Sequence, residues 1–482
     1  MARGKKKKSL TPEECLQAAL VPESEQPYSV PENWCWTKGC AFLKPMETKH
    51  PEGEVFRYID IDAIDNKKQQ VTEPKTLLVK DAPSRASRKL RTGDTIFSMV
   101  RPYLMNIAYI DETISNSIAS TGFYVCTPAE NVNPLYLYYL MTSPYTVEGL
   151  NRYMKGDNSP SIRKDDIENY PYPIPPLAEQ QRIVGRIESL FAKLDEAKQK
   201  AQDALDSFET RKAAILHKAF AGELTVQWRK EHGTGMESWQ TKKYSEICNI
   251  VRGGSPRPAG SLEFYGGNIP FMKVADITRN TGPYVNSTEY TIKEAGLKKT
   301  RMVDRNTLLL TNSGATLGVP AICTFKTTFN DGIAAFLGLN PDTLLFHYYF
   351  WTSKTADLRA INKGAAQPNL NTDIIGNVEI SLPRENEQRE IVRILDVLLA
   401  KEQQAKEAAE GVLEQIDLIK KAILARAFRG QLGTNDPTEE SAQELMKKFC
   451  FKNAAERELK WAKIVLICAG LQPKCMNFLM AK

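Results

Sequence analysis

Two stretches of the chain, 175–224 and 383–432, carry apolar residues at alternating steps of four and three, which predicts two long amphipathic helices. Lys, Glu, Asp and Gln flank these positions, as they do on the outer faces of a coiled coil. Val412 and Ile419 continue the pattern in the second stretch. The predicted seam consists of Ile183, Ile187, Leu190, Leu194, Ala201, Phe208 and Ile215 in the first helix and Ile391, Leu395, Leu398, Ala409, Ile416 and Ile423 in the second.

A helix over residues 178–220 rises roughly 60 Å at 1.5 Å per residue, and a single apolar stripe does not stabilise such a helix in isolation. We expect the two helices to pair with each other as an antiparallel coiled coil with a pseudo-two-fold axis. Packing of each helix against its own domain is the alternative. Arg211 and Glu402 are the polar exceptions in the two seams, and Gly222 and Gly430 stand where C-terminal caps are expected.

The chain contains an internal duplication. A shift of 208 residues places Pro175–Leu224 on Pro383–Leu432 without a gap, and about 20 of the 50 positions are identical. Upstream the same offset continues and then weakens, so the repeated unit is a diverged domain followed by a well-matched helix. The expected parts are an extension (1–26), domain 1 (27–174), the central helix (175–224), domain 2 (225–382), the distal helix (383–432) and a tail (433–482).

The two domains alternate short strand patterns with helical ones, which predicts the α+β class. In domain 1 the expected strands are 54–65, 76–80, 95–101, 106–111 and 122–126, with helix over 135–139 and 142–153. In domain 2 the expected strands are 269–278, 307–311, 319–325 and 333–338, with a helix near 343–362.

Both copies share a loop frame in which the polar side chains change. The frame Lys-Gly, Pro and an apolar residue recurs at 155–163 and 363–371, while Ser159 is replaced by Gln367 and Ser161 by Asn369. Amide side chains can pair with adenine edges and arginine with guanine. The exchange therefore suits two domains that read different DNA sequences, although ordinary turns with free variation at exposed positions remain the alternative.

Further candidates lie in two loops that follow predicted strands, 98–103 and 311–316. Arg252 precedes the basic loop 253–258, which could clamp a phosphate. The candidate DNA-binding residues are Arg101, Tyr103, Lys155, Asn158, Ser159, Ser161, Arg163, Arg252, Asn312, Ser313, Thr316, Lys363, Gln367, Asn369 and Asn371.

Composition is compatible with this interpretation but does not require it. A chain of 482 residues suits two or more domains, and a net charge of +6 permits nucleic-acid binding. Nine cysteines include no Cys-x-x-Cys pair, so neither a zinc ribbon nor a disulfide framework is indicated, and a reducing cytoplasm is expected. The apolar stretch 464–471 is too short to span a membrane.

The sequence offers no catalytic motif. It has no Gly-x-x-x-x-Gly-Lys-[Ser/Thr] loop, no convincing nuclease carboxylate cluster, and four scattered histidines without metal-binding spacing. Asn133-Pro134-Leu135-Tyr136 faintly resembles an amino-methyltransferase motif, but we interpret it as a helix start. We therefore expect a chain that is not an enzyme and binds no metal.

The duplicated segments Pro-x-x-x-Glu-Gln (175–180 and 383–388) and the helix ends Ala-Ile-Leu-x-x-Ala-Phe-x-Gly-x-Leu (214–224 and 422–432) resemble the specificity subunit of bacterial type I restriction–modification systems. The resemblance covers about residues 25–448. It implies two target-recognition domains, each reading one half of a bipartite site in double-stranded DNA. The coiled coil would set the spacer between the half-sites and dock the partner subunits.

The same resemblance implies two modification subunits that use S-adenosylmethionine and two restriction subunits that use ATP and Mg²⁺, so this chain would bind no cofactor itself. Two alternatives remain open: the recognition part of a fused methyltransferase–nuclease, and a coiled-coil scaffold that reads no DNA. Residues 449–482 match nothing in the family pattern.

Overall fold

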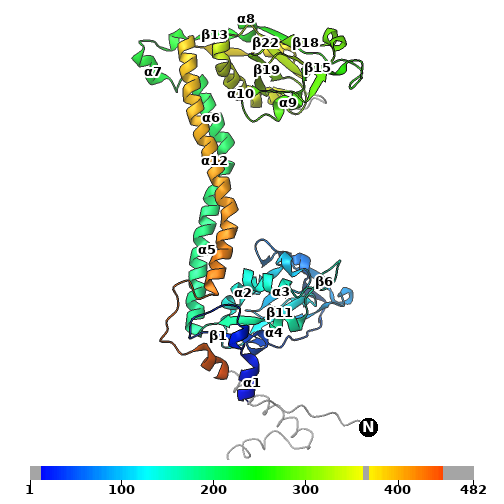
Figure 1. The fold of residues 1–482 in the computed structure, drawn as a ribbon, viewed down its shortest axis with the longest axis vertical. Helices are drawn as coiled ribbons and strands as arrows, with labels where there is room; N and C mark the ends of the chain where they lie inside the picture. The colour runs from blue at the N-terminus through cyan, green and yellow to red at the C-terminus, as the bar shows by residue number, and fades with distance from the viewer. Residues whose placement is uncertain (1–11, 362–368, 449–482) are drawn as a thin grey trace, which may run out of the picture. The chain divides into compact units, whose positions relative to one another are not determined.

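The computed structural model describes residues 12–361 and 369–448. The chain divides into two compact units, here called unit 1 (1–199 with 412–482) and unit 2 (200–411). Each unit combines a mixed α+β domain with portions of both predicted helical stretches (Figure 1). Two of the candidate residues, Lys363 and Gln367, lie outside the described residues.

The first predicted helix is divided in two, α5 (Leu177–Asp206) and α6 (Phe208–Phe220), whereas the second is the continuous helix α12 (Glu385–Ala427). The interruption lies at Ser207, whose hydroxyl donates to the backbone carbonyl of Asp203 at 2.7 Å. Such bonds from a serine to the preceding turn compete with the helical backbone and bend helices. The prediction of one uninterrupted helix over this stretch was therefore wrong at this residue.

The helices pair in antiparallel fashion within each unit. In unit 1 the Lys420 ammonium of α12 lies 2.6 Å from the Asp195 carboxylate of α5 and 5.1 Å from the ring centre of Phe191. In unit 2 the Arg211 guanidinium of α6 binds Glu402 of α12 at 2.8 Å. The two polar exceptions in the predicted seams therefore neutralise each other, and the expected antiparallel pairing is confirmed.

All thirteen predicted seam residues are buried or partly buried. Val412 and Ile419, which continued the heptad pattern, are instead 40% and 41% exposed. Ile416 and Ile423, seven residues apart, keep the contact, so the contact line in this part of α12 runs along their side and not through positions 412 and 419. The prediction that these two side chains belong to the seam was wrong.

The caps predicted at the helix ends are present. Gly222 and Gly430 adopt φ values of +76° and +70°, the left-handed region in which glycine is unstrained. In each case the next residue donates its backbone N–H to a carbonyl five residues back, from Glu223 to Lys218 and from Gln431 to Arg426, both at 2.9 Å. This is the bond of a Schellman cap.

Unit 1 contains a four-stranded sheet β2-β11-β8-β9, a second sheet β6-β3-β10-β7 and two strand pairs, β1-β12 and β4-β5. The strands are β1 (Cys35–Lys38), β2 (Leu43–Lys44), β3 (Val55–Ile59), β4 (Ile64–Asp65), β5 (Gln70–Val71), β6 (Lys75–Leu78), β7 (Ala86–Lys89), β8 (Thr95–Ser98), β9 (Ile107–Tyr109), β10 (Ile118–Ser120), β11 (Phe123–Pro128) and β12 (Pro171–Ile174). The domain helices are α1 (Pro12–Ala19), α2 (Pro134–Thr142), α3 (Pro144–Asn151) and α4 (Lys164–Asn169).

Unit 2 contains a five-stranded sheet β14-β22-β19-β20-β16, a four-stranded sheet β17-β15-β21-β18 and the pair β13-β23. The strands are β13 (Gln240–Lys243), β14 (Asn249–Arg252), β15 (Tyr265–Met272), β16 (Tyr284–Val285), β17 (Tyr290–Ile292), β18 (Arg301–Val303), β19 (Thr307–Thr311), β20 (Pro320–Cys323), β21 (Thr327–Phe329), β22 (Ile333–Leu337) and β23 (Glu379–Leu382). The domain helices are α7 (Val226–Glu231), α8 (Tyr244–Ile247), α9 (Val274–Thr278), α10 (Leu344–Ile361) and α11 (Thr372–Gly376).

The same layered plan recurs in both units. In unit 2, Leu308 and Leu310 of β19 join the core that contains α10, while Leu309 joins the core shared with the sheet of β15. In unit 1, Phe97 of β8 joins the core that contains α2, while Ile96 joins the core shared with β3 and β10. Successive residues of a strand point to opposite faces, so the middle of a central strand that is covered on both sides is apolar on both faces.

Several strand predictions need correction. The expected strand 269–278 is β15 up to Met272 followed by the helix α9, and the expected continuous strand 54–65 is two separate strands with a 3₁₀ turn at Ile61–Ala63. The helix start proposed at Asn133 is confirmed, because its side chain accepts bonds from the backbone N–H groups of Leu135 and Tyr136. That bonding is the geometry of an N-cap.

Candidate DNA interface

Two candidate loops of unit 1 lie side by side. The backbone N–H of Arg101, just after β8, donates to the carbonyl of Pro160 at 2.8 Å, and Ile162 donates to Met99 at 2.9 Å. Ser161 forms isolated bridges with both Val100 and Lys155. Loops 98–103 and 155–163, which are distant in sequence, therefore form one continuous surface.

Arg101 shapes this surface as well as contributing to it. Its backbone has a φ of +48°, and its guanidinium donates to the carbonyl of Asn158 at 2.9 Å. That bond holds the backbone of the second loop and leaves the Asn158 side chain exposed. Tyr103 in the adjoining 3₁₀ turn is 47% exposed, a high value for an aromatic residue. The loop thus presents a cation, an amide and an aromatic ring to solvent.

The remaining candidates in unit 1 differ in accessibility. Lys155, Ser159 and Arg163 are exposed, whereas Ser161 is partly buried by its bridges. Arg163 immediately precedes α4, and its backbone N–H donates to the Asp166 carboxylate at 2.6 Å. Its location is fixed by this turn while its side chain remains exposed.

Unit 2 brings its own two loops together in the same way. Ser313, after β19, forms an isolated bridge with Asn369, and the N–H of Leu370 donates to the carbonyl of Asn312 at 2.7 Å. Asn369 and Thr316 are exposed and Ser313 is partly buried. The duplicated loop frame therefore places equivalent segments beside equivalent strands in both units.

Three candidate side chains of unit 2 are either buried or hydrogen-bonded within the domain. Asn312 is only 1% exposed, so its side chain cannot reach a base edge. Asn371 caps α11 by accepting from the N–H of Ile374 at 2.8 Å, and Arg252 is partly buried and donates to the carbonyl of Asp331 at 2.7 Å. Asn371 and Arg252 are thus engaged within the domain, whereas the Asn312 side chain is enclosed without a hydrogen-bond partner among the described residues. The sequence pattern could not show any of these placements.

A buried carboxylate anchors each helix to its domain. In unit 1, Glu179 at the start of α5 accepts from the Trp34 indole at 2.8 Å, from Asn435 at 2.8 Å and from Thr434 at 3.3 Å. Glu179 is fully buried, so these bonds replace its lost hydration. The segments that supply them come from the domain start and from the residues after α12.

Unit 2 repeats this arrangement with one addition. Glu387 accepts from the Trp239 indole at 3.0 Å and from Thr225 at 2.7 Å, and it also forms a buried ion pair with Arg229 at 2.7 Å. The duplicated Glu-Gln motif is visible in the sequence, but its structural role is not. Trp34 and Trp239, which open the two halves, were the available signal for this contact.

The glutamine of each motif closes the turn before its helix. The side-chain amide of Gln180 donates to the carbonyl of Pro175 at 3.0 Å, and that of Gln388 donates to Pro383 at 2.8 Å. These bonds explain the fixed distance between proline and glutamine in the motif. The same bonds fix the end of strand β12 at the start of α5 and the end of strand β23 at the start of α12.

Within residues 12–361 and 369–448, no group of three or more His, Cys, Asp or Glu side chains could hold a metal ion. His347 is buried beside the Tyr244 hydroxyl at 3.0 Å, and burial lowers the pKa of its imidazole to about 4. Over the same part of the chain, every helix is too short or too polar to cross a membrane.

Comparison with known proteins agrees with this architecture. A family model described as type I restriction modification DNA specificity domain matches residues 44–205 and 236–411. The EcoDI specificity subunit of Escherichia coli is 32% identical over 155 residues, which span 32% of this chain and 34% of that protein. The HindI specificity subunit of Haemophilus influenzae is 22% identical over 421 residues, which span 73% of this chain and 90% of that protein.

Solved structures give the same result. The crystal structure of the HsdS subunit from Thermoanaerobacter tengcongensis superposes with a TM-score of 0.65 at 28% identity, covering 85% of this chain and 100% of that one. A chain from a structural study of type I R-M complex assembly gives a TM-score of 0.62 at 29% identity, covering 84% and 100%. Because the family model covers both halves, the chain belongs to the type I restriction–modification DNA specificity family.

Proposed function

We propose that this chain is the specificity subunit of a type I restriction–modification complex and selects the DNA site at which its partners act. The observation that carries the proposal is the duplicated loop pair. Each unit holds two loops together by backbone bonds, and each exposes different polar side chains on the same frame. A chain with two such surfaces can read two different short sequences, as a bipartite and asymmetric DNA site requires.

The backbone bonds position the loops, and the exposed side chains would read the DNA. The main chain of Arg101 and of Ser313 bonds to the neighbouring segment in each unit, while Asn158 and Asn369 keep exposed side-chain amides. An amide can form paired hydrogen bonds with adenine in the major groove. Exchange of these side chains would change the sequence read without altering the fold.

We also propose that catalysis belongs to the partner subunits. Two modification subunits would bring S-adenosylmethionine and methylate adenine in each half-site, and two restriction subunits would use ATP and Mg²⁺. The paired helices would dock the modification subunits and set the spacing between the half-sites. The family membership favours this role over a fused methyltransferase–nuclease or a scaffold that reads no DNA. The complex would act in the cytoplasm, where its DNA substrate lies.

Single loop variants test the assignment of readout to the loops. Asn158→Ala and Asn369→Ala remove side-chain amides but keep the backbone bonds. In a complex reconstituted with the modification subunits, each variant should relax base preference in one half-site, because a lost amide–base pair costs about 1–3 kcal/mol of discrimination. Glu263→Ala, an exposed change outside these loops, is the control. Equal relaxation of both halves by either variant would contradict the proposal.

A further inference from the structure

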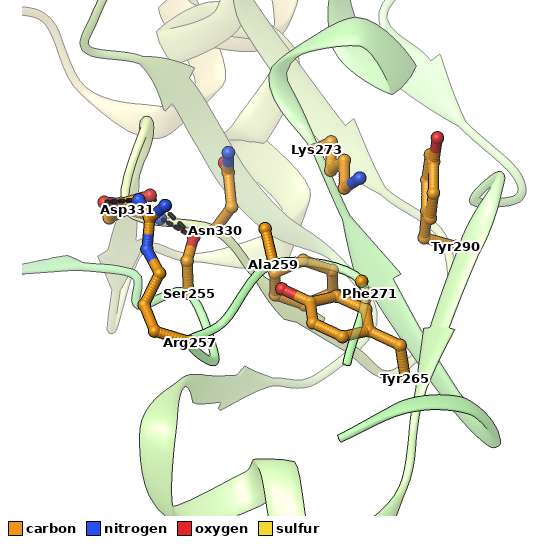
Figure 2. A pocket seen from close by; sticks show the side chains of 10 residues that line it. Ser255, Arg257, Ala259, Tyr265, Phe271, Lys273, Tyr290, Asn330 and Asp331 are labelled. Carbon is orange, nitrogen blue, oxygen red and sulfur yellow. Dashed lines mark hydrogen bonds and ion pairs between the residues drawn. The ribbon is translucent and has the colours of Figure 1, made fainter. Parts of the chain in front are cut away.

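Unit 2 contains a cavity of about 400 Å³ beside the candidate DNA surface (Figure 2). Its walls come from the loop after β14, from β15 and β17, and from the turn between β21 and β22. Tyr265 and Phe271 form an aromatic corner, with ring centres 5.8 Å apart and planes at 80°. Figure 2 shows Lys273 and Tyr290 on one side of this corner and Asp331 on the other.

The cavity combines flat aromatic surfaces with hydrogen-bonding groups. The ammonium of Lys273 lies 3.1 Å from the ring centre of Tyr290, which is itself 40% exposed. The cavity therefore offers an aromatic surface and an ammonium donor.

The cavity lining carries charges of both signs, with the Asp331 carboxylate beside the cations Arg257 and Lys273. The Asp331 carboxylate accepts from the Ser255 hydroxyl at 2.6 Å and lies 3.9 Å from the Arg257 guanidinium. A nucleobase is planar and carries both donors and acceptors, so it can bond to groups of both signs while its face lies against an aromatic ring. Aromatic stacking and amide contacts are the means by which proteins hold unstacked bases.

The surroundings supply contacts for a nucleic-acid backbone. Gly254 lies against the backbone of Lys299 so closely that an added Cβ would be 2.4 Å from the Lys299 carbonyl oxygen. Lys298, Lys299 and Arg301 are all exposed, so cations border the loop that forms the cavity. Cations on this border can bind phosphates while the base enters the cavity.

The cavity is also continuous with the predicted recognition loops. The N–H of Asn312 donates to the carbonyl of Gly332 at 2.9 Å, and Arg252 donates to Asp331 at 2.7 Å. The turn that carries Asn330 and Asp331 is thus bonded directly to the loop after β19, which belongs to the candidate DNA surface. We propose that this cavity binds a single unstacked base of the DNA bound by unit 2. The proposal rests on the DNA-reading function proposed above.

A thermodynamic cycle tests this site, in which one DNA base and one side chain are removed separately and together. Complexes containing the wild-type chain or the Tyr290→Ala variant are assembled with the modification subunits on a duplex that carries the methylated site. An abasic residue replaces each nucleotide of the unit 2 half-site and its flanks in turn. At one position the abasic residue should weaken wild-type binding about tenfold, as expected for one stacked base. The same substitution should change binding of the variant by less than twofold.

Tyr284→Ala is the matched control, because Tyr284 is a 42% exposed tyrosine of the same unit that does not line the cavity. It should keep the full tenfold effect. Equal abasic penalties in wild type and Tyr290→Ala at every position would overturn the proposal. Calorimetric binding of deoxynucleoside monophosphates that Tyr290→Ala abolishes, without coupling to any DNA position, would instead assign the cavity to free nucleotides and refute the DNA source.

Failure of this site can be distinguished from failure of the proposed function. A complex that methylates a defined bipartite site and yet shows no coupling refutes the cavity proposal alone. A complex whose DNA binding and methylation show no sequence preference refutes the function on which the cavity proposal rests.

Discussion

The duplicated carboxylates Glu179 and Glu387 provide an internal comparison, because only one of them has a buried cationic partner. We expect Glu387→Gln to destabilise unit 2 more than Glu179→Gln destabilises unit 1. Glu387 pairs with Arg229 at 2.7 Å, and the two side chains are only 2% and 7% exposed. The substitution leaves the guanidinium buried without a counter-charge, which typically costs about 3–5 kcal/mol.

Glu179 accepts its bonds from the neutral side chains of Trp34, Thr434 and Asn435. Its replacement by glutamine therefore weakens hydrogen bonds without stranding a charge, at about 1–3 kcal/mol. The two variants should differ by about 2 kcal/mol. Hydrogen exchange measured by mass spectrometry on peptides covering 177–187 and 385–395 reports the free energy of opening at each helix start.

The double variant Glu387→Gln with Arg229→Met supplies the control. It removes the unpaired cation, so it should recover much of the stability lost in Glu387→Gln. Equal loss from Glu179→Gln and Glu387→Gln, or no recovery in the double variant, would refute the reasoning that the buried charge is responsible for the difference.

Arg211→Ala and Glu402→Ala should each lower the unfolding free energy by about 0.5–1 kcal/mol, because the ion pair is partly exposed. The double variant that exchanges the two charges should restore most of this free energy in thermal unfolding. A further loss of stability in the double variant would contradict a pairing role. The His347 pKa of about 4 lies below its ordinary 6.5, so the unfolded state binds the proton more readily and stability is lost as pH falls from 6.5 towards 4. At pH 5 the unfolding free energy should be about 2 kcal/mol lower than at pH 7. His347→Gln should remove this pH-dependent loss. If urea unfolding of the variant keeps the full pH dependence, His347 is excluded as its source.

Features repeated along the chain could be predicted well from sequence. The apolar spacing predicted the pairing of α5 and α6 with α12, and the glycines after the last apolar positions predicted the caps. These features depend on local patterns that the duplication displays twice. The charges at Arg211 and Glu402 were visible as exceptions, but their contact required the antiparallel pairing to be known.

Features that depend on contacts between distant segments could not be predicted. Asn312 is polar and follows a strand, as an exposed reading residue would, yet the chain near Gly332 and Leu370 bonds its backbone and the domain covers its side chain. Strands of two or three residues, such as β10, carry too short a pattern to recognise. The interruption at Ser207 arises from a side-chain bond that an apolar pattern does not record.

Exchange of one recognition domain tests the central claim most directly. Residues 27–174 are replaced by the equivalent segment of a relative from the same family, and the complex with the modification subunits is expressed in a host whose methylated DNA sites are then sequenced. The account predicts that one half of the bipartite site changes to that of the donor and the other half stays the same. Simultaneous change of both halves, or an unchanged site, would contradict it.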